Sequence, residues 1–460
     1  MHWLDLLVLG FYLLCILFLG FYRTNNKNEP DEYILAGRKL SLPSFVITLT
    51  ATWYGGILGI GENTYLFGLQ TWFVFGLPYY LFALIFAFFI AGKINRLNST
   101  SIPDQFHSRY GKTAGIISAL YILVLSSPAP YILSVGVLLQ FSLGLPFSFS
   151  LLLSTTISLC YIWFGGFRSI IRTDFIQVVF MFLGFILLLY YCIKYSSINS
   201  ISLNTLPKSH LDFTGGASIQ YILAWFFIAL WTFVDPGFYQ RCAAAKSAKT
   251  AKNGILIAIC FWFIFDILTL STGMYAKVLL TNGDPLFSYP RLGALVLPPL
   301  VYGIFITGLL ATIMSTIDSL GFISAITFGR DILWRIRSQK GMNSKEWDMT
   351  STNFIREGLI VTALIALSLA FIIPSVVKLW YILGSILIPG LILPFLISFS
   401  SMKITILPMM IIPILVSSIW IIIGQIVGNY PLELEPFYPG MLTSITVSYT
   451  HLTLPTNRDV

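Results

Sequence analysis

Runs of about 20 apolar residues recur along this chain, and they limit its fold more than any other sequence feature. A helix of that length crosses the hydrocarbon of a bilayer, where backbone polar groups are satisfied only inside helices or closed barrels. Hydrophobic residues make up 57% of the chain and charged residues 10%, whereas soluble domains carry roughly a quarter charged residues. We therefore predict an all-α polytopic membrane protein. The expected spans lie near residues 3–22, 42–69, 71–92, 113–142, 147–164, 170–193, 217–239, 253–276, 296–327, 357–373, 376–399 and 404–428, with a partial thirteenth from residue 437.

The net charge of +8 is distributed unevenly among the predicted loops. Twenty-one of the 27 Lys and Arg residues, Arg241 among them, fall in loops that would share one side, against five on the other, Arg458 being left aside. Cytoplasmic loops are the basic ones, so this bias predicts a multi-pass protein of the plasma (inner) membrane with its N-terminus outside. Because topology explains the charge, we expect no nucleic-acid partner.

Two short segments inside apolar runs carry the most informative polar groups. Residues 50–59 place Gly55-Gly56 within an expected helix, which would free backbone carbonyls. Residues 310–319 place Thr312, Ser315 and Thr316 on one helical face, with a carboxylate close by. Hard cations such as sodium take oxygen ligands of this kind. The two segments predict an ion site inside a transporter, although Ser and Thr also commonly bond to their own helix carbonyls.

A second pair of helix breakers, Pro236-Gly237, lies at a place in the second half of the chain that roughly corresponds to Gly55-Gly56. Paired interruptions point to a substrate site near the membrane midplane. Two simpler roles stay open for these residues, because glycines also permit close helix packing and Pro236-Gly237 is near a predicted helix end.

Acidic residues inside predicted spans are costly in lipid and are functional candidates for that reason. They are Glu62, Asp174, Asp235, Asp266 and Asp318. Glu62 follows the Gly55-Gly56 break on the same span and would face the substrate or the outer vestibule. For Asp266 we expect a structural hydrogen bond, and for Asp235 an anchor beside Gln240-Arg241 at the cytoplasmic end of its span.

Four motifs occur in a fixed order, and together they carry a family resemblance. They are Ala51-Thr52-Trp53-Tyr54-Gly55-Gly56, then Gly165-Gly166-Phe167-Arg168 leading to Thr173-Asp174 and Gln177, then Asp235-Pro236-Gly237-Phe238-Tyr239-Gln240-Arg241, and then Met314-Ser315-Thr316-Ile317-Asp318-Ser319 followed by Arg330-Asp331. The chain resembles the sodium:solute symporter family, which includes sodium/proline, sodium/pantothenate and sodium/glucose symporters. The resemblance covers nearly the whole chain up to about residue 446.

The resemblance implies a five-plus-five inverted-repeat core of the leucine-transporter type, with flanking helices. The expected division is an N-terminal helix and first cytoplasmic loop at 1–41, a first repeat at 42–195, an outer loop at 196–216, a second repeat at 217–399, peripheral helices at 400–446, and a non-native tail at 447–460. The tail is expected to be non-native because polar residues interrupt what starts as another span at residue 437, so the native protein would continue past about Thr446.

By the same resemblance, sodium would bind carbonyl oxygens of Ala51, Tyr54 and Thr312 and the hydroxyls of Ser315 and Thr316. A second cation or proton site would be bordered by Asp174, Asp318 and Ser319, unless Asp318 instead pairs with Arg168 or Arg172. The expected substrate-binding residues are Trp53, Gly55, Gly56, Glu62, Tyr131 and Trp231.

These observations predict a secondary active transporter that carries a small organic solute with Na⁺ as the coupling ion, by alternating access. A proton-coupled symporter of the same fold is the alternative, and a channel is less favoured because no repeated filter or ring of like charge occurs. No nucleophile–base pair or metal cluster is expected at a membrane face, so we do not expect an enzyme.

Overall fold

The structure is a computed structural model that describes residues 1–22, 30–97, 99–280, 282–337, 350–402 and 404–453. The regular structure of these residues is helical, apart from one isolated bridge between Leu40 and Ala245, which confirms the predicted all-α class. Ten of the described helices are long and apolar enough to cross a membrane, and one bent helix pair raises the number to eleven.

The chain contains both long and short helices. The long ones are α1 (Trp3–Phe21), α3 (Leu42–Trp53), α4 (Ile57–Phe67), α6 (Leu77–Phe89), α9 (Lys112–Leu125), α10 (Ala129–Leu143), α11 (Phe147–Ile198), α12 (Ile219–Ile228), α15 (Ala248–Leu279), α17 (Val301–Ile326), α19 (Ser351–Ile372), α20 (Val376–Ile397), α21 (Ile406–Val427) and α22 (Phe437–Thr453). The short ones that bear on the site are α2 (Pro30–Leu35), α5 (Gln70–Phe75), α8 (Ile102–Tyr110), α13 (Trp231–Val234), α14 (Pro236–Ala244) and the π-helical turn η5 (Thr327–Trp334).

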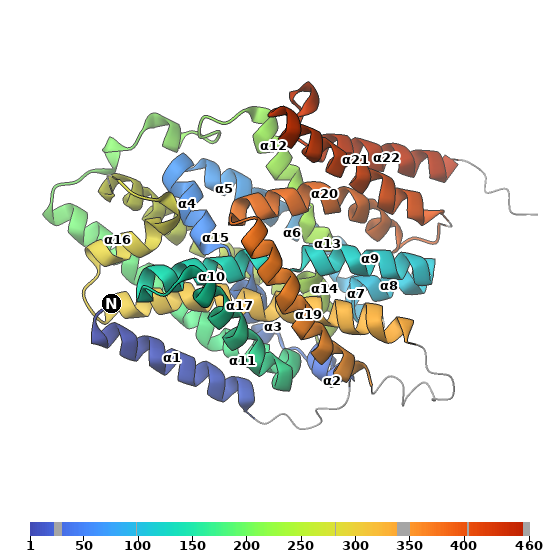
Figure 1. Ribbon diagram of the computed structural model, residues 1–460, viewed down its shortest axis with the longest axis horizontal. Helices are drawn as coiled ribbons and strands as arrows, with labels where there is room; N and C mark the ends of the chain where they lie inside the picture. The colour runs from blue at the N-terminus through green and yellow to red at the C-terminus, as the bar shows by residue number, and fades with distance from the viewer. Residues whose placement is uncertain (23–29, 98, 281, 338–349, 403, 454–460) are drawn as a thin grey trace, which may run out of the picture.

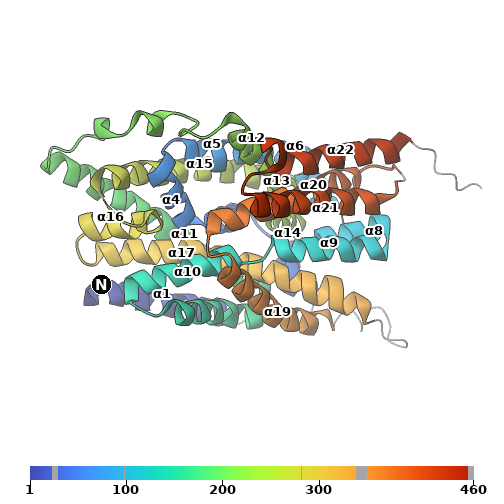
Figure 2. The ribbon, with the colours of Figure 1, turned by 45° about the horizontal axis from the view of Figure 1, so that its top comes forward.

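Helix α17 runs through the middle of the molecule in both ribbon views, with α1 on one flank (Figures 1 and 2). It is buried without interruption from Phe305 to Ile326, as expected for an apolar helix that is surrounded by other helices. Helices α1, α3, α10, α11 and α19 pack against it. The polar residues of α17 therefore face protein rather than lipid.

Helix α11 joins two of the expected spans, 147–164 and 170–193, which the sequence predicts as separate helices. The two parts meet at a kink at Gly166, whose φ of 57° and ψ of −152° are not helical. A Cβ atom there would lie 2.6 Å from the carbonyl oxygen of Tyr33, so α2 can pack against the kink only because Gly166 has no side chain.

The helix that begins at Leu42 is broken, as predicted. Helix α3 ends at Trp53, Tyr54 to Gly56 form a turn, and α4 departs at 57°. The second predicted interruption is also present, because α13 ends at Val234 and α14 begins at Pro236. Between them, Asp235 is extended and its carboxylate accepts the N–H of Phe238, which caps the new helix.

The C-terminal helices α21 and α22 lie against α20 at the edge opposite to α1 (Figure 1). Helix α22 continues to Thr453, past the residue at which the sequence predicts the native chain to depart. Residues 454–460 of the expected non-native tail lie outside the described residues.

Candidate functional site

The broken end of α3 meets the middle of α17 through hydroxyl groups. Ser315 Oγ donates to the carbonyl of Ala51 at 2.6 Å, and Thr316 Oγ1 donates to the carbonyl of Thr52 at 2.8 Å. These carbonyls lie in the last turn of α3, where the helix ladder stops and carbonyl oxygens need other partners. The contact gathers backbone and hydroxyl oxygens in one buried place.

Four of the five predicted sodium-site residues come together here. The carbonyl of Thr312 is 3.1 Å from Ser315 Oγ, while the hydroxyl of Thr312 bonds back to Gly308 at 2.7 Å. The fifth, Tyr54, belongs to the turn, where its carbonyl accepts the N–H of Ile57 at 3.0 Å. We call the carbonyl oxygens of Ala51, Thr52 and Thr312 and the hydroxyl oxygens of Ser315 and Thr316 the α3–α17 oxygen cluster. Oxygens of this kind are the ligands that a hard cation takes.

The predicted second-site residues separate into two environments. Ser319 lies 2.9 Å from Thr52 Oγ1, and Asp174 accepts a hydrogen bond from Thr48, so both belong to the interface with α3. Asp318 instead has the side-chain amide of Gln177 at 3.5 Å. Of its two alternative partners, Arg168 forms an ion pair with Glu32 and Arg172 donates to the carbonyl of Tyr22.

Arg241 corrects a sequence expectation, because it lies in the core of the molecule and not in a cytoplasmic loop. Its side chain is fully buried, and it donates to Thr48, Thr52 and Ser319. The cause is the length of α14, which continues to Ala244 beyond the predicted span end at residue 239. A short helix started by Asp235 and Pro236 therefore brings a guanidinium into the interior of the protein.

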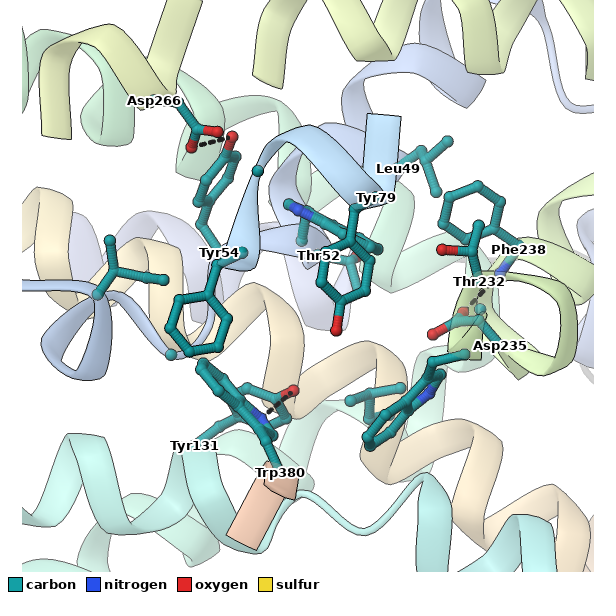
Figure 3. Close-up of a pocket in the computed structure, with 18 of the residues that line it drawn as sticks. Leu49, Thr52, Tyr54, Tyr79, Tyr131, Thr232, Asp235, Phe238, Asp266 and Trp380 are labelled. Atoms are coloured by element: carbon teal, nitrogen blue, oxygen red, sulfur yellow. Dashed lines mark hydrogen bonds between the residues drawn. The ribbon is translucent and has the colours of Figure 1, made fainter. Parts of the chain in front are cut away.

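A cavity of about 120 Å³ adjoins the break in α3 (Figure 3). Its walls are rich in aromatic side chains, and of the predicted substrate residues Trp53, Gly56, Tyr131 and Trp231 contribute to it. Further aromatic walls, which the sequence analysis did not single out, are Trp72, Phe75, Tyr79, Phe238 and Trp380. The indole N–H of Trp380 donates to Tyr131 Oη at 3.3 Å, which joins two of these walls.

Two predicted substrate residues do not line the cavity. A Cβ atom on Gly55 would lie 2.4 Å from the side chain of Thr316, so Gly55 allows close approach of α17. Glu62 is two residues beyond Ile60, which does line the cavity. Residues two apart on a helix point to nearly opposite faces, so Glu62 is directed away from the cavity.

Two acidic residues of the cavity wall were not predicted to bind substrate. Asp235 and Asp266 both line the cavity, and Figure 3 shows their carboxyl groups on different sides of it. Asp266 accepts a hydrogen bond from Tyr54 Oη at 2.9 Å and another from Tyr80. The expected structural hydrogen bond of Asp266 is therefore present, but at the cavity wall. The sequence signal that could have placed Asp266 at a functional site was the free-energy cost of an acidic residue inside a membrane span.

At one end of the molecule, α8 and η5 are joined by ion pairs. Asp104 pairs with Arg335 and lies 3.7 Å from Arg330, and Asp331 lies 3.0 Å from Arg330. Burial acts to raise the pKa of Asp104, but Arg330 and Arg335 outweigh it and hold that pKa below its ordinary value. The Arg330-Asp331 motif therefore contributes to a charged clasp between these two elements.

Broken helices around a buried oxygen cluster and an internal cavity, inside a shell of apolar helices, define a multi-pass membrane transporter. The sequence profile of the Sodium:solute symporter family matches residues 33–411. The chain belongs to this family, and it carries out sodium-driven secondary transport of a small solute with Na⁺ as the coupling ion.

Relatives of this chain are transporters from bacteria and animals. It is 26% identical to the osmoregulated proline transporter OpuE of Bacillus subtilis (strain 168), over 79% of this chain and 76% of the relative. It is 25% identical to the high-affinity choline transporter 1 of Drosophila melanogaster, over 80% of this chain and 62% of the relative. It is 24% identical to the high-affinity proline transporter PutP of Bacillus subtilis (strain 168), over 77% and 78%.

Solved structures share the fold. A Na⁺-coupled sialic acid symporter in a substrate-bound outward-open state superimposes with a TM-score of 0.78 at 17% identity, covering 98% of this chain and 97% of that one. Mhp1, a nucleobase-cation-symport-1 family transporter, gives a TM-score of 0.57 at 12% identity, covering 93% and 94%. The fold is the leucine-transporter type that the resemblance implied.

Proposed function

We propose that this chain is a symporter of the plasma (inner) membrane that couples sodium to a small organic solute bearing a positively charged nitrogen. The N-terminus lies outside, and the two repeats span 42–195 and 217–399. The observation that carries the proposal is the cavity, whose aromatic and acidic walls adjoin the α3–α17 oxygen cluster.

Sodium binds at the α3–α17 oxygen cluster in this proposal. The carbonyls of Ala51, Tyr54 and Thr312 and the hydroxyls of Ser315 and Thr316 supply five oxygens, without a carboxylate among them. Ala51 and Ser315 are each no more than 1% exposed, so bulk water could not easily replace a lost ligand. An ion there would link α3 to α17 and thereby fix the turn at Tyr54 beside the cavity.

The chemistry of the cavity favours a cationic solute. Faces of Trp and Tyr attract ammonium groups, most strongly where water is excluded. Asp235 and Asp266 add two carboxyl groups to the wall, to which Arg241 contributes a guanidinium. Relatives are named for proline and for choline, and both of those solutes carry a positively charged nitrogen.

A pair of probes that differ only in charge tests this proposal. Choline and its neutral carbon isostere 3,3-dimethylbutan-1-ol have nearly the same shape, so a cation site must separate them. We expect choline to raise the thermal unfolding midpoint of the purified chain, more in sodium chloride than in potassium chloride, because coupling between ion and solute is reciprocal. The isostere should have little effect. Equal shifts from both probes would exclude a cation-selective cavity, and proline and glycine betaine extend the same comparison to zwitterions.

Variants locate the effect. Asp266→Asn keeps the size of the side chain but removes its charge, and we expect it to weaken choline binding by about tenfold, which corresponds to about 1.4 kcal/mol. Asp212→Asn in the exposed segment before α12 is the matched control and should bind as the wild type does. If Asp266→Asn binds choline as the wild type does, the carboxylate only accepts the hydrogen bonds of Tyr54 and Tyr80 and does not contact the solute.

A further inference from the structure

One nitrogen atom of Arg241 is surrounded by oxygen. Nη2 lies 3.1 Å from the carbonyl of Thr48, 2.9 Å from Thr48 Oγ1, 2.6 Å from Thr52 Oγ1 and 2.9 Å from Ser319 Oγ. An amino group of a guanidinium carries only two of its five protons. Four oxygens within 3.1 Å are therefore more acceptors than this group has protons to give. We call these four oxygens the oxygen cage.

Two of the three hydroxyl groups in this oxygen cage, those of Thr48 and Thr52, donate to other acceptors. Thr48 Oγ1 donates to a carboxylate oxygen of Asp174, and Thr52 Oγ1 donates to the carbonyl of Thr48 at 2.8 Å. Each hydroxyl has one proton, so the remaining lone pairs of Thr48 and Thr52 face Arg241. Lone pairs converging on one point are the arrangement by which oxygens coordinate a metal cation.

The cage resembles the α3–α17 oxygen cluster but lies one helical turn away from it, toward the N-terminus of α3 and toward the C-terminus of α17. That cluster uses Ala51 and Thr52 of α3 with Ser315 and Thr316 of α17, whereas the cage uses Thr48 and Thr52 with Ser319. Steps of three or four residues correspond to one turn of a helix, about 5.4 Å. The interface between α3 and α17 therefore holds two neighbouring cation positions.

The carboxyl group of Asp174 lies beside the second position. Asp174 is fully buried and reaches the cage through the hydroxyl of Thr48, and its other carboxylate oxygen has no hydrogen-bond partner among the described residues. Arg241 approaches from α14, where its other amino group donates to the carbonyl of Gly237 at 3.3 Å. Its guanidinium also lies over the ring of Phe167, 5.7 Å from the centroid.

We propose that Arg241 is a resident cation that fills the second cation position, so that the chain binds one sodium ion rather than two. The proposal rests on the proposed sodium site for the identity of the first ion. In this proposal, Ser319 and Asp174 surround the guanidinium of Arg241 and do not bind a second sodium ion. Two cations cannot share the cage, because like charges at this separation repel strongly in a buried place.

Counting bound ions tests the proposal without knowledge of the solute. Equilibrium binding of radioactive sodium to the purified full-length chain should give one ion per wild-type chain and two per Arg241→Gln chain, because glutamine removes the charge and leaves the oxygens. Arg241→Lys, which keeps a cation, should give one. Lys246→Gln, which removes the charge of an exposed lysine two residues past the end of α14, is the matched control and should also give one.

A second sodium ion on the wild-type chain, or a single ion on Arg241→Gln, would overturn the resident cation. Ser315→Ala separates the two proposals. If it keeps the wild-type ion while Arg241→Gln still gains one, the proposed sodium site is wrong and the resident cation stands. Should Arg241→Gln unfold in low salt, sodium chloride is expected to restore it better than potassium chloride at equal ionic strength. Equal restoration by both salts contradicts a cation cage.

Discussion

Two hydroxyl groups hold the broken end of α3 against α17. Ser315 and Thr316 each reach a carbonyl of α3, although a hydroxyl inside a helix can usually bond its own backbone. Thr327, the first residue of η5 after α17, makes the usual bond to its own helix, because its hydroxyl donates to the carbonyl of Ile323. Ser315 and Thr316 also lie 3.1 and 3.4 Å from the carbonyl of Thr312 in their own helix, so the shorter contacts to α3 are made in addition to the usual ones.

Removing either hydroxyl should weaken sodium binding while the protein stays folded. A hydrogen bond or ligand to a charged group contributes about 1.5–3 kcal/mol, so we expect Ser315→Ala and Thr316→Ala each to lower apparent sodium affinity by roughly 10- to 100-fold. The measurement is a sodium titration of thermal stability. Thr327→Ala is the matched control, and a wild-type titration curve in both site variants would mean that these hydroxyls only pack two helices together.

At the scale of elements, the break between α3 and α4 depends on the absence of side chains. A Cβ atom at Gly56 would lie 1.9 Å from the indole ring of Trp380, and one at Gly55 would lie 2.4 Å from Thr316. Helix α20 thus closes on the turn at Gly56, and α17 closes on it at Gly55. The two glycines bring a cavity wall and the α3–α17 oxygen cluster to the same turn.

Gly56→Ala should therefore displace Trp380 from the cavity wall. Overpacking of this kind costs about 1–3 kcal/mol, and we expect it mainly as a loss of solute affinity, because an aromatic wall moves. Gly10→Ala in α1 is the control, since a Cβ atom there meets no atom of the described residues within 4 Å and alanine favours a helix over glycine. Unchanged choline binding in Gly56→Ala would show that Trp380 does not contact the solute.

At the scale of the whole molecule, the charged clasp between α8 and η5 connects the two halves of the chain. Asp104 lies before α9, whereas Arg330 and Arg335 follow α17. Ser101 completes the clasp, because its hydroxyl donates to Asp331 at 2.7 Å. The clasp ties the end of the buried central helix to a segment of the first half.

Acid should weaken this clasp. The pKa of Asp104 is held below its ordinary value, near 3.9 for an unfolded chain, because the two arginines outweigh its burial. Its contribution to stability is then complete above about pH 4 and is lost as the pH falls through the lowered folded pKa. We expect Asp104→Asn to lower the unfolding midpoint at pH 7, and the gap from wild type to narrow toward pH 3. Asp31→Asn, at an exposed ion pair, should show neither effect. A gap that stays constant with pH would rule out this role.

Much of the fold follows from patterns that lie within single segments. Spans were predicted from apolar length, and the broken helix from Gly55-Gly56, because both are local properties. The two spans 147–164 and 170–193 were likewise predicted as separate helices, and the non-helical backbone of Gly166 divides α11 between them.

The candidate site was predicted less completely, because its parts come from distant helices. Ala51, Ser315 and Thr316 belong to motifs, whereas Asp266 is defined by tyrosines from two other segments of the chain. Arg241 was misplaced by an error of a few residues in the end of one span. The predicted span ends at the polar pair Gln240-Arg241, whereas the alanines at 243–245 favour continuation of the helix.

Tyr54 has a backbone in the turn beside the α3–α17 oxygen cluster and a hydroxyl that donates to Asp266 and to the carbonyl of Trp262. Tyr54 therefore connects the proposed sodium site to the wall of the proposed solute cavity. If sodium and solute bind as proposed, a change at position 266 that alters the choice of solute also alters how firmly this tyrosine is held, and through it the arrangement of the proposed sodium ligands. Laboratory selection for a new solute at this wall would consequently return variants with a shifted salt requirement, and a transporter re-engineered here would have to be optimised for both cargoes together.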